Sequence, residues 1–284
     1  MMKIGMNLLL WTDCPTAREH GALLRNIKNW GFDGVEFPVQ PMADADITAM
    51  SQQCDDLGLG RSAILALDAT LFDPASSDAK LRNAAVDEIR RVIDQTHAIG
   101  ADVLCGPLYQ GLGRFSGNAP TEQEHDWAVE VIRRAGEYAA EAKVRLALEP
   151  LNRFEMYMVN TVAAGRKFVE RVGLENVGLL ADTHHSNIEE DNTVSNWDAV
   201  ADKIYHVHIS ENHRGTPGSG HAIQPELFDM LHRRGYDGWT TIEAFSLEVP
   251  GLVPRLHLWR VPEINPEKLA REGLQFIREN INRL

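Results

Sequence analysis

Short runs of apolar and β-branched residues recur along the chain, and each is followed by a longer segment with helical spacing of apolar positions. Several runs are almost continuously apolar, as expected for strands of a parallel sheet that is covered on both faces. The pattern predicts eight strands: KIGMNLLLW from Lys3, DGVEFP from Asp33, GRSAILAL from Gly60, ADVLCGPL from Ala101, VRLALEP from Val144, VGLLADT from Val177, IYHVHIS from Ile204 and WTTIEAF from Trp239. Strands that alternate with helices in this order are typical of βα units.

Glycine marks the expected ends of several helices, directly before the next strand: Gly31, Gly58, Gly100, Gly173 and Gly235. Glycine is common there because it adopts the left-handed conformation without steric cost. The connections are short and no linker rich in proline or serine interrupts them, so we expect a single domain over residues 1–284.

Eight βα units can close into a barrel or form an open sheet. No Gly-x-Gly-x-x-Gly motif follows the first strand, which argues against a dinucleotide-binding open sheet. The sequence therefore predicts an α/β fold, a (β/α)₈ TIM barrel, with functional residues where the strands end. Three long segments, residues 109–120, 211–222 and 249–262, are expected to cover that end.

Charge and cysteine content narrow the choice of partners. The formal charge of −13 comes from 41 acidic and 28 basic side chains, so the outer field repels nucleic acid and anionic membranes. Cys14, Cys54 and Cys105 form no Cys-x-x-Cys pair, which disfavours a disulfide framework and a thiolate zinc site and fits a reducing compartment. No apolar stretch approaches a membrane span. We therefore expect a cytoplasmic protein that acts on a small molecule.

Four metal-ligand side chains stand at or near the ends of four consecutive predicted strands: Glu149, Asp182, His208 and Glu243. In a closed barrel these strand ends lie side by side, so the side chains can converge without help from loops. Three carboxylates and one imidazole suit Mn²⁺, Mg²⁺ or Co²⁺ better than a thiolate-seeking ion. The pattern predicts one divalent metal ion, with Mn²⁺ as the first expectation.

A simpler interpretation applies to each position taken alone, because a carboxylate at a strand end often only caps the next helix. Glu149 and Glu243, however, interrupt apolar runs, where an unpaired charge would be costly. His206 points to the same side as His208, and we expect it to be a hydrogen-bonded core histidine rather than a ligand.

Four segments resemble those of a known family: ALEPLNRFE, LADTHHSNIEE, HVHISENHRGTPGSGH and TTIEAF. They are similar to the ketose 3-epimerases that act on D-tagatose, D-psicose (D-allulose) or L-ribulose, within the xylose isomerase-like barrels. The likeness extends to the first strand and to the C-terminal WR…LAREGLQFIREN segment, so it covers nearly the whole chain.

The resemblance implies a role for each matching residue. Glu149, Asp182, His208 and Glu243 match the metal ligands, and the two glutamates also match the acid–base pair. Glu155, His185 and Arg214 match residues that bind the sugar. The expected reaction is inversion at C3, in which one carboxylate removes a proton beside the carbonyl and the other returns one from the opposite face. The family also implies a homodimer or homotetramer.

Two segments differ from those of close relatives, so the resemblance does not determine which sugar is the substrate. The first strand reads GMNLLLW, and the fourth strand leads into CGPLYQGLGRFSG, where relatives contact the tail of the sugar. Trp11, Leu108 and Tyr109 are candidates for this lining, with apolar packing as the equal alternative. His184 has no assigned role.

Other activities use the same proton abstraction. An aldose–ketose isomerase such as hydroxypyruvate isomerase and an inosose dehydratase-like lyase are the main enzymatic alternatives. A sugar-phosphate epimerase is another, because Arg214 and the GTPGSG segment could hold a phosphate. A nuclease resembling endonuclease IV is disfavoured by the acidic balance, and a barrel that only binds sugar is the non-enzymatic alternative.

Overall fold

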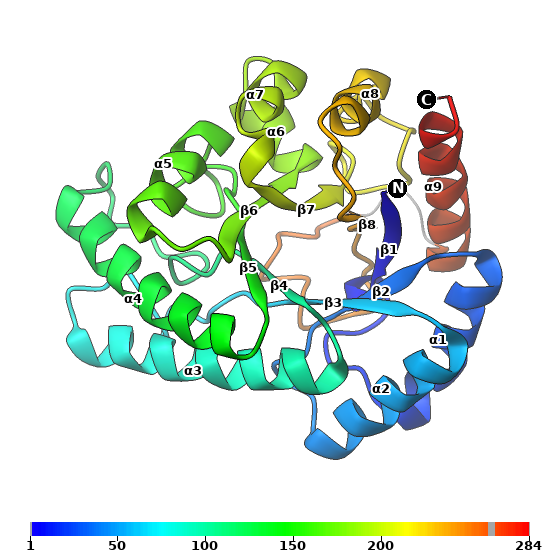
Figure 1. The fold of residues 1–284 in the computed structure, drawn as a ribbon, viewed down its shortest axis with the longest axis horizontal. Helices are drawn as coiled ribbons and strands as arrows, with labels where there is room; N and C mark the ends of the chain where they lie inside the picture. Colours follow the sequence, from blue (N-terminus) through cyan, green and yellow to red (C-terminus); the bar gives the residue numbers. More distant parts are fainter. Residues whose placement is uncertain (1, 261–264, 284) are drawn as a thin grey trace.

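A closed barrel of eight parallel strands in chain order forms the centre of the molecule (Figure 1). The structure is a computed structural model that describes residues 2–260 and 265–283. The strands are β1 Lys3–Asn7, β2 Gly34–Phe37, β3 Gly60–Ile64, β4 Val103–Gly106, β5 Arg145–Leu148, β6 Val177–Asp182, β7 Ile204–Ile209 and β8 Trp239–Ile242. The predicted fold class is thereby confirmed, and each predicted strand contains one of these eight.

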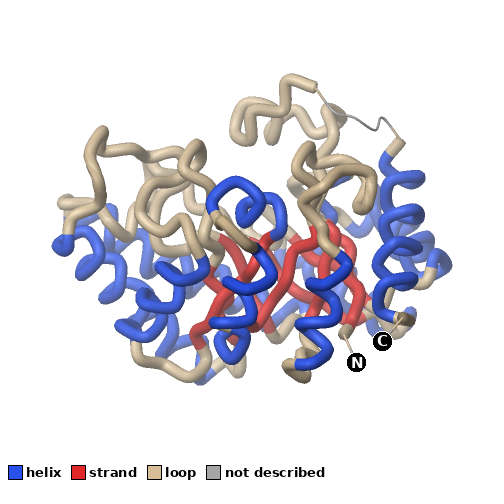
Figure 2. The backbone as a smooth tube through the Cα atoms, turned by 90° about the horizontal axis from the view of Figure 1, so that it is seen from above, coloured by secondary structure: helices blue, strands red, loops and turns tan. Residues whose placement is uncertain are grey.

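Helices surround the barrel, and the loops that follow the strands gather at one end of it (Figure 2). The α-helices are α1 Ala17–Trp30, α2 Asp44–Leu57, α3 Ala79–Ile99, α4 Glu122–Glu141, α5 Val162–Val172, α6 Thr183–Glu189, α7 Thr193–Ala199, α8 Pro225–Arg233 and α9 Pro266–Ile281, with 3₁₀ turns η1 Leu8–Leu10 and η2 Ala201–Lys203. In the described part of the chain, every helix is too short or too polar to cross a bilayer.

The glycines that were expected to end helices lie in the left-handed region, with these φ angles: Gly31 107°, Gly58 61°, Gly100 83°, Gly173 76° and Gly235 71°. The first strand is shorter than predicted. The Asn7 side chain accepts a hydrogen bond from the Leu9 amide at 2.8 Å and starts the turn η1, so LLLW leaves the sheet.

The large apolar core lies between the strands and the helices, whereas the barrel interior holds a smaller one. Its apolar members are Ile64, Val103, Cys105, Ala147 and Leu180. Strand register then places polar residues in line above it, because Asp182 on β6 pairs with His208 on β7. The ends of β5 to β8 therefore bring their polar side chains together at one end of the barrel.

The three long segments cover the expected end of the barrel, and residues 261–262 of the third lie outside the described part of the chain. Val249, Leu252 and Leu258 of this third segment form an apolar cluster with Phe245. The described part of the segment is therefore anchored by these three side chains.

Candidate active site

The four predicted ligands converge in one buried cluster. Ligand atoms of Glu149, Asp182, His208 and Glu243 all lie within 4.8 Å of one another. His208 Nδ1 is 3.4 Å from Glu243 Oε1 and 3.7 Å from Asp182 Oδ2, and Glu149 Oε1 is 3.8 Å away from it. Consecutive strands thus deliver three acidic side chains and one imidazole to a single point.

The cluster fits a divalent cation because its facing atoms lack other partners. Glu149 Oε1, Asp182 Oδ2 and His208 Nδ1 are buried without a hydrogen bond, although such atoms are almost always satisfied in folded proteins. The other oxygen of Asp182 caps α6 by accepting from the His185 amide at 3.1 Å. Asp182 is therefore both a helix cap and a candidate ligand, so the two interpretations are compatible.

A carboxylate that was not predicted orients His208 from below. Glu36 of β2 lies inside the barrel, where its Oε1 is 2.9 Å from His208 Nε2 and its Oε2 is 2.7 Å from His206 Nε2. Asn7 and Ser62 donate to the same carboxylate at 2.8 and 2.9 Å. His208 Nε2–H donates to Glu36, which leaves the Nδ1 lone pair facing the acidic cluster. The signal was present in the sequence, because Glu36 also interrupts an apolar strand.

The charges of Glu36 and His208 shift each other's pKa. Burial would raise the pKa of Glu36, but His208 and His206 hold it well below its usual range. Burial would lower the pKa of His208, but Glu36 and Glu243 raise it well above its usual range. The negative charge that favours a proton on His208 Nδ1 favours a cation at the same place. His206 is a buried core histidine, as expected.

The two candidate acid–base residues differ in their surroundings. Burial and the neighbouring Glu243 raise the pKa of Glu149 well above its ordinary value. Burial would also raise the pKa of Glu243, but His208 and Arg214 lower it to about 2. Such a separation of two carboxylates is common at sites of proton transfer.

Arg214 reaches into the cluster from the segment after β7. Its Nη1 donates to Glu243 Oε2 and to Ser210 Oγ, each at 2.7 Å, and lies 3.6 Å from Asp182 Oδ2. Its guanidinium lies 5.1 Å from the ring of Phe245. The backbone of Arg214 is left-handed with φ 59°, a conformation that costs energy for a residue with a side chain. The local structure therefore holds this arginine at the site.

His185 is held by a residue that sequence reasoning did not single out. The Asn152 amide donates to His185 Nδ1 at 3.1 Å, and Asn152 Nδ2 donates to Glu155 Oε1 at 2.7 Å. Burial lowers the pKa of His185 well below its usual range, so the ring is neutral. Because Nδ1 accepts from the Asn152 backbone N–H, the proton of the neutral ring is on Nε2. That nitrogen lies 3.6 Å from Glu149 Oε1.

His184 does not line the cavity. Its Nδ1 is 3.0 Å from the Glu211 carbonyl oxygen, and its ring meets that of His185 edge-on at 5.2 Å. Burial and then Arg214 lower the pKa of His184 to about 4. Its ring therefore packs against His185 and does not form part of the cavity wall.

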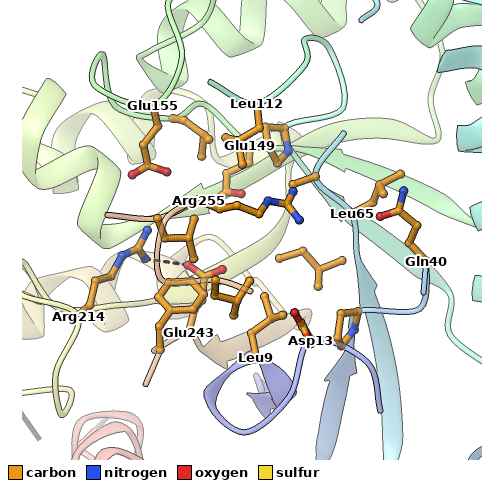
Figure 3. A pocket seen from close by; sticks show the side chains of 18 of the residues that line it. Leu9, Asp13, Gln40, Leu65, Leu112, Glu149, Glu155, Arg214, Glu243 and Arg255 are labelled. Atoms are coloured by element: carbon orange, nitrogen blue, oxygen red, sulfur yellow. Dashed lines mark hydrogen bonds and ion pairs between the residues drawn. The ribbon is translucent and has the colours of Figure 1, made fainter. Parts of the chain in front are cut away.

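A cavity of about 290 Å³ opens above the cluster and brings the predicted sugar-binding residues together. Glu149, Glu155, His185, Arg214 and Glu243 all line it, and Figure 3 shows the carboxylates of Glu149 and Glu243 directed into it. The remaining wall is mainly apolar.

Of the two alternatives for Trp11, Leu108 and Tyr109, the structure favours apolar packing, because none of the three lines this cavity. Trp11 stacks on Trp30 with ring centroids 6.3 Å apart, and Leu108 is fully buried in the core. The Tyr109 hydroxyl donates to the carbonyl oxygens of Glu149 and Val159, each at 2.9 Å. Its ring therefore packs behind the end of β5 rather than in the cavity.

The alternative of a phosphate held by Arg214 and the GTPGSG segment gains no support from the contacts that the structure describes there. Glu211 already accepts from the amides of Gly218 at 2.9 Å and Ala222 at 3.2 Å. Arg214, which could have held the phosphate together with this segment, donates through Nη1 to Glu243. In the segment 109–120, Arg114 pairs with Asp73 at 3.0 Å and contributes nothing to the cavity wall.

Comparison with known proteins agrees with this geometry. The family described as xylose isomerase-like TIM barrel matches residues 24–280. The chain is 32% identical to the L-ribulose 3-epimerase of Mesorhizobium japonicum, over 98% of this chain and 93% of that protein. A solved L-ribulose 3-epimerase structure superposes with a TM-score of 0.93 at 32% identity, covering 100% of this chain and 95% of that one.

A second solved structure contains a sugar. The D-allulose 3-epimerase from Methylomonas sp. in complex with D-allulose has a TM-score of 0.90 at 28% identity, with 98% of this chain and 97% of that chain covered. The chain belongs to the ketose 3-epimerases of the xylose isomerase-like TIM barrel family.

Proposed function

We propose that this protein is a divalent-metal-dependent ketose 3-epimerase that inverts C3 of a free ketose of the D-tagatose, D-psicose/D-fructose or L-ribulose type. One observation carries the proposal. The carboxylates of Glu149 and Glu243 enter a single cavity from the ends of β5 and β8, and unpartnered ligand atoms lie between them. The activities of the relatives support the same reaction class.

The cation would be held by Glu149, Asp182, His208 and Glu243. When bound, it stabilises the negative charge that develops on the ketose oxygens as the C3–H bond ionises. Mn²⁺ is our first choice, with Mg²⁺ or Co²⁺ as alternatives, because the donor set is mainly hard oxygen with one imidazole nitrogen.

The two glutamates perform the proton transfers. One carboxylate removes the proton from C3, and the electron pair of the broken C–H bond forms the C2–C3 double bond of an enediolate. The other carboxyl group then donates a proton to C3 from the opposite face, and the C2 carbonyl re-forms. The glutamates exchange roles in the reverse reaction, so one pair serves both C3 epimers.

Arg214 and His185 orient the reacting end of the sugar. Arg214 Nη2 lies 3.3 Å from His185 Nε2, so two donor groups face the same part of the cavity. Both can donate to the oxygens at C1 and C2, where charge accumulates. Glu155 is held by Asn152 and can accept from a hydroxyl at this end.

The test is a panel of D-fructose, D-tagatose and L-ribulose with added Mn²⁺, Mg²⁺ or Co²⁺. A C3 epimer that incorporates one deuterium at C3 in deuterated water is the expected product. An aldose would instead identify an aldose–ketose isomerase, and loss of the mass of water would identify a dehydratase. Substitution of Glu149 and Glu243 by Gln without loss of turnover would contradict the proposed roles.

We further propose a cytoplasmic homodimer or homotetramer. The described surface exposes large apolar side chains, including Phe154 at 69% and Trp259 at 73%, which association between copies would cover. Cys14, Cys54 and Cys105 are free thiols, in keeping with a reducing compartment. Light scattering after size exclusion measures the mass, and a monomer would contradict the proposed assembly.

A further inference from the structure

One arginine of the cavity wall, Arg255, interacts with Asp68 through its charge but does not form an ion pair with it. Arg255 belongs to the turn of the segment after β8 and lines the cavity together with the catalytic residues (Figure 3). Within residues 2–260 and 265–283, its guanidinium forms neither a hydrogen bond nor an ion pair. Nη1 of the other cavity-lining arginine, Arg214, already donates to Glu243 and Ser210. A guanidinium in a mainly apolar wall is therefore left available to a ligand.

Two hydrogen-bond acceptors line the same cavity as Arg255, away from the reacting end. Figure 3 shows Asp13 and Gln40 on the side of the cavity opposite Glu155 and Arg214. Gln40 Nε2 donates to Glu88 Oε1 at 2.8 Å, which leaves the Gln40 carbonyl oxygen as its free acceptor. The distal wall thus offers a carboxylate, an amide oxygen and a guanidinium.

The position of these groups is supported by the covering segment. A side chain at Gly251 would collide with Asp13 Oδ2, so the segment approaches this carboxylate closely. Leu252 and Leu258, which flank Arg255 in sequence, are both buried against Phe245 in one apolar cluster. Arg255 itself is exposed on the turn between these anchors. Its substitution should therefore leave the apolar anchors intact.

We propose that Arg255 is a specificity-determining residue that donates to the oxygens of the sugar beyond C4, while Asp13 and Gln40 accept from the hydroxyls of the same tail. The inference rests on the proposed function, because the glutamates at the other end define where C3 lies. The proposed substrate therefore has an uncharged tail of hydroxyl groups. A phosphate in this position would be repelled by the Asp13 carboxylate.

The test compares two substrates in wild type and in Arg255→Met. A ketohexose that the enzyme epimerises has a tail, whereas erythrulose ends at C4 and still has an invertible C3. We expect R255M to lower kcat/KM for the ketohexose roughly tenfold or more, mainly through KM, because a hydrogen bond from a charged donor is lost. The value for erythrulose should stay within about twofold, since no tail atom is present.

Arg260→Met is the matched control, because Arg260 lies on the same segment and does not line the cavity. R260M should leave both substrates unchanged, and Arg255→Lys should restore part of the ketohexose activity. Equal losses on both substrates in R255M, or no loss on either, would overturn the assignment. Absence of C3 epimerisation of every ketose by the wild type would instead overturn the proposed function.

Asp13→Ala separates a neutral tail from an anionic one. If the tail is neutral, D13A lowers kcat/KM for the ketohexose and leaves erythrulose unchanged. If wild type prefers a ketohexose 6-phosphate, and D13A strengthens that preference while R255M abolishes it, the neutral-tail assignment is wrong.

Discussion

His208 and Glu36 form a buried pair that connects the barrel interior to the candidate metal site. Glu36 Oε1 lies 2.9 Å from His208 Nε2, although the two residues are 172 positions apart in sequence. The pair decides which imidazole nitrogen faces the acidic cluster, because the Nε2 proton is engaged below. This arrangement is typical of metal-ligating histidines, whose second nitrogen donates to a carboxylate.

Substitution Glu36→Gln should weaken cation binding by roughly 10–100-fold, because the amide carries no negative charge and has one accepting oxygen where the carboxylate has two. Calorimetric titration with Mn²⁺ measures the effect, and circular dichroism checks that the barrel persists. An unchanged Mn²⁺ affinity in a folded E36Q protein would show that Glu36 only fills the core.

Substitutions Glu149→Gln and Glu243→Gln should each lower kcat by roughly 10²–10⁴-fold, the usual contribution of general acid–base catalysis. Turnover of the preferred ketose at saturating Mn²⁺ is the measurement, with bound metal determined in parallel. Glu175→Gln, at an exposed position, serves as the control. A variant that retains metal and full turnover would remove that glutamate from the mechanism.

Removal of the cation should destabilise the fold as well as abolish turnover. Glu149, Asp182 and Glu243 are buried together, and a bound cation offsets their mutual repulsion. At about a hundredfold excess over Kd, the ion adds about 2.7 kcal/mol to the free energy of unfolding. Thermal unfolding with EDTA and with Mn²⁺ should therefore differ by roughly 5–10 °C. Equal midpoints would argue against a resident ion.

Glu124 provides a pH-dependent prediction away from the site. It forms a capping box with Thr121 at the start of α4 and accepts from the Tyr157 hydroxyl at 2.5 Å. Burial would raise the pKa of Glu124, but the hydrogen bond from Tyr157 and those from Thr121 lower it overall. A carboxylate with a lowered folded-state pKa stabilises above its unfolded pKa and loses that contribution as pH falls through the folded value.

Glu124→Gln keeps the capping geometry and removes the charge, so it should lower the free energy of unfolding by about 1 kcal/mol at neutral pH. The difference from wild type should shrink below about pH 4, near the unfolded pKa of glutamate. Urea unfolding at several pH values measures it, with Glu122→Gln in the same turn as the control. A difference that is independent of pH would assign the effect to packing rather than charge.

The sequence by itself determined the repeating βα order and the end of the barrel at which the site lies. Both follow from local physics, because strand and helix periodicities differ and parallel strands carry their functional residues at one end. Glu149, Asp182, His208 and Glu243 could be predicted together, since four consecutive strands close side by side whatever their loops do.

Only the tertiary structure decided how these side chains are supported and what surrounds them. Glu36 meets His208 across the barrel interior, and Arg255 reaches the cavity because its segment folds back over the mouth. Tyr109 shows the converse, since a residue at a strand exit points into the core once its hydroxyl finds two carbonyl oxygens. Local periodicity carries no information about such contacts, because they depend on barrel closure and loop packing between residues far apart in sequence.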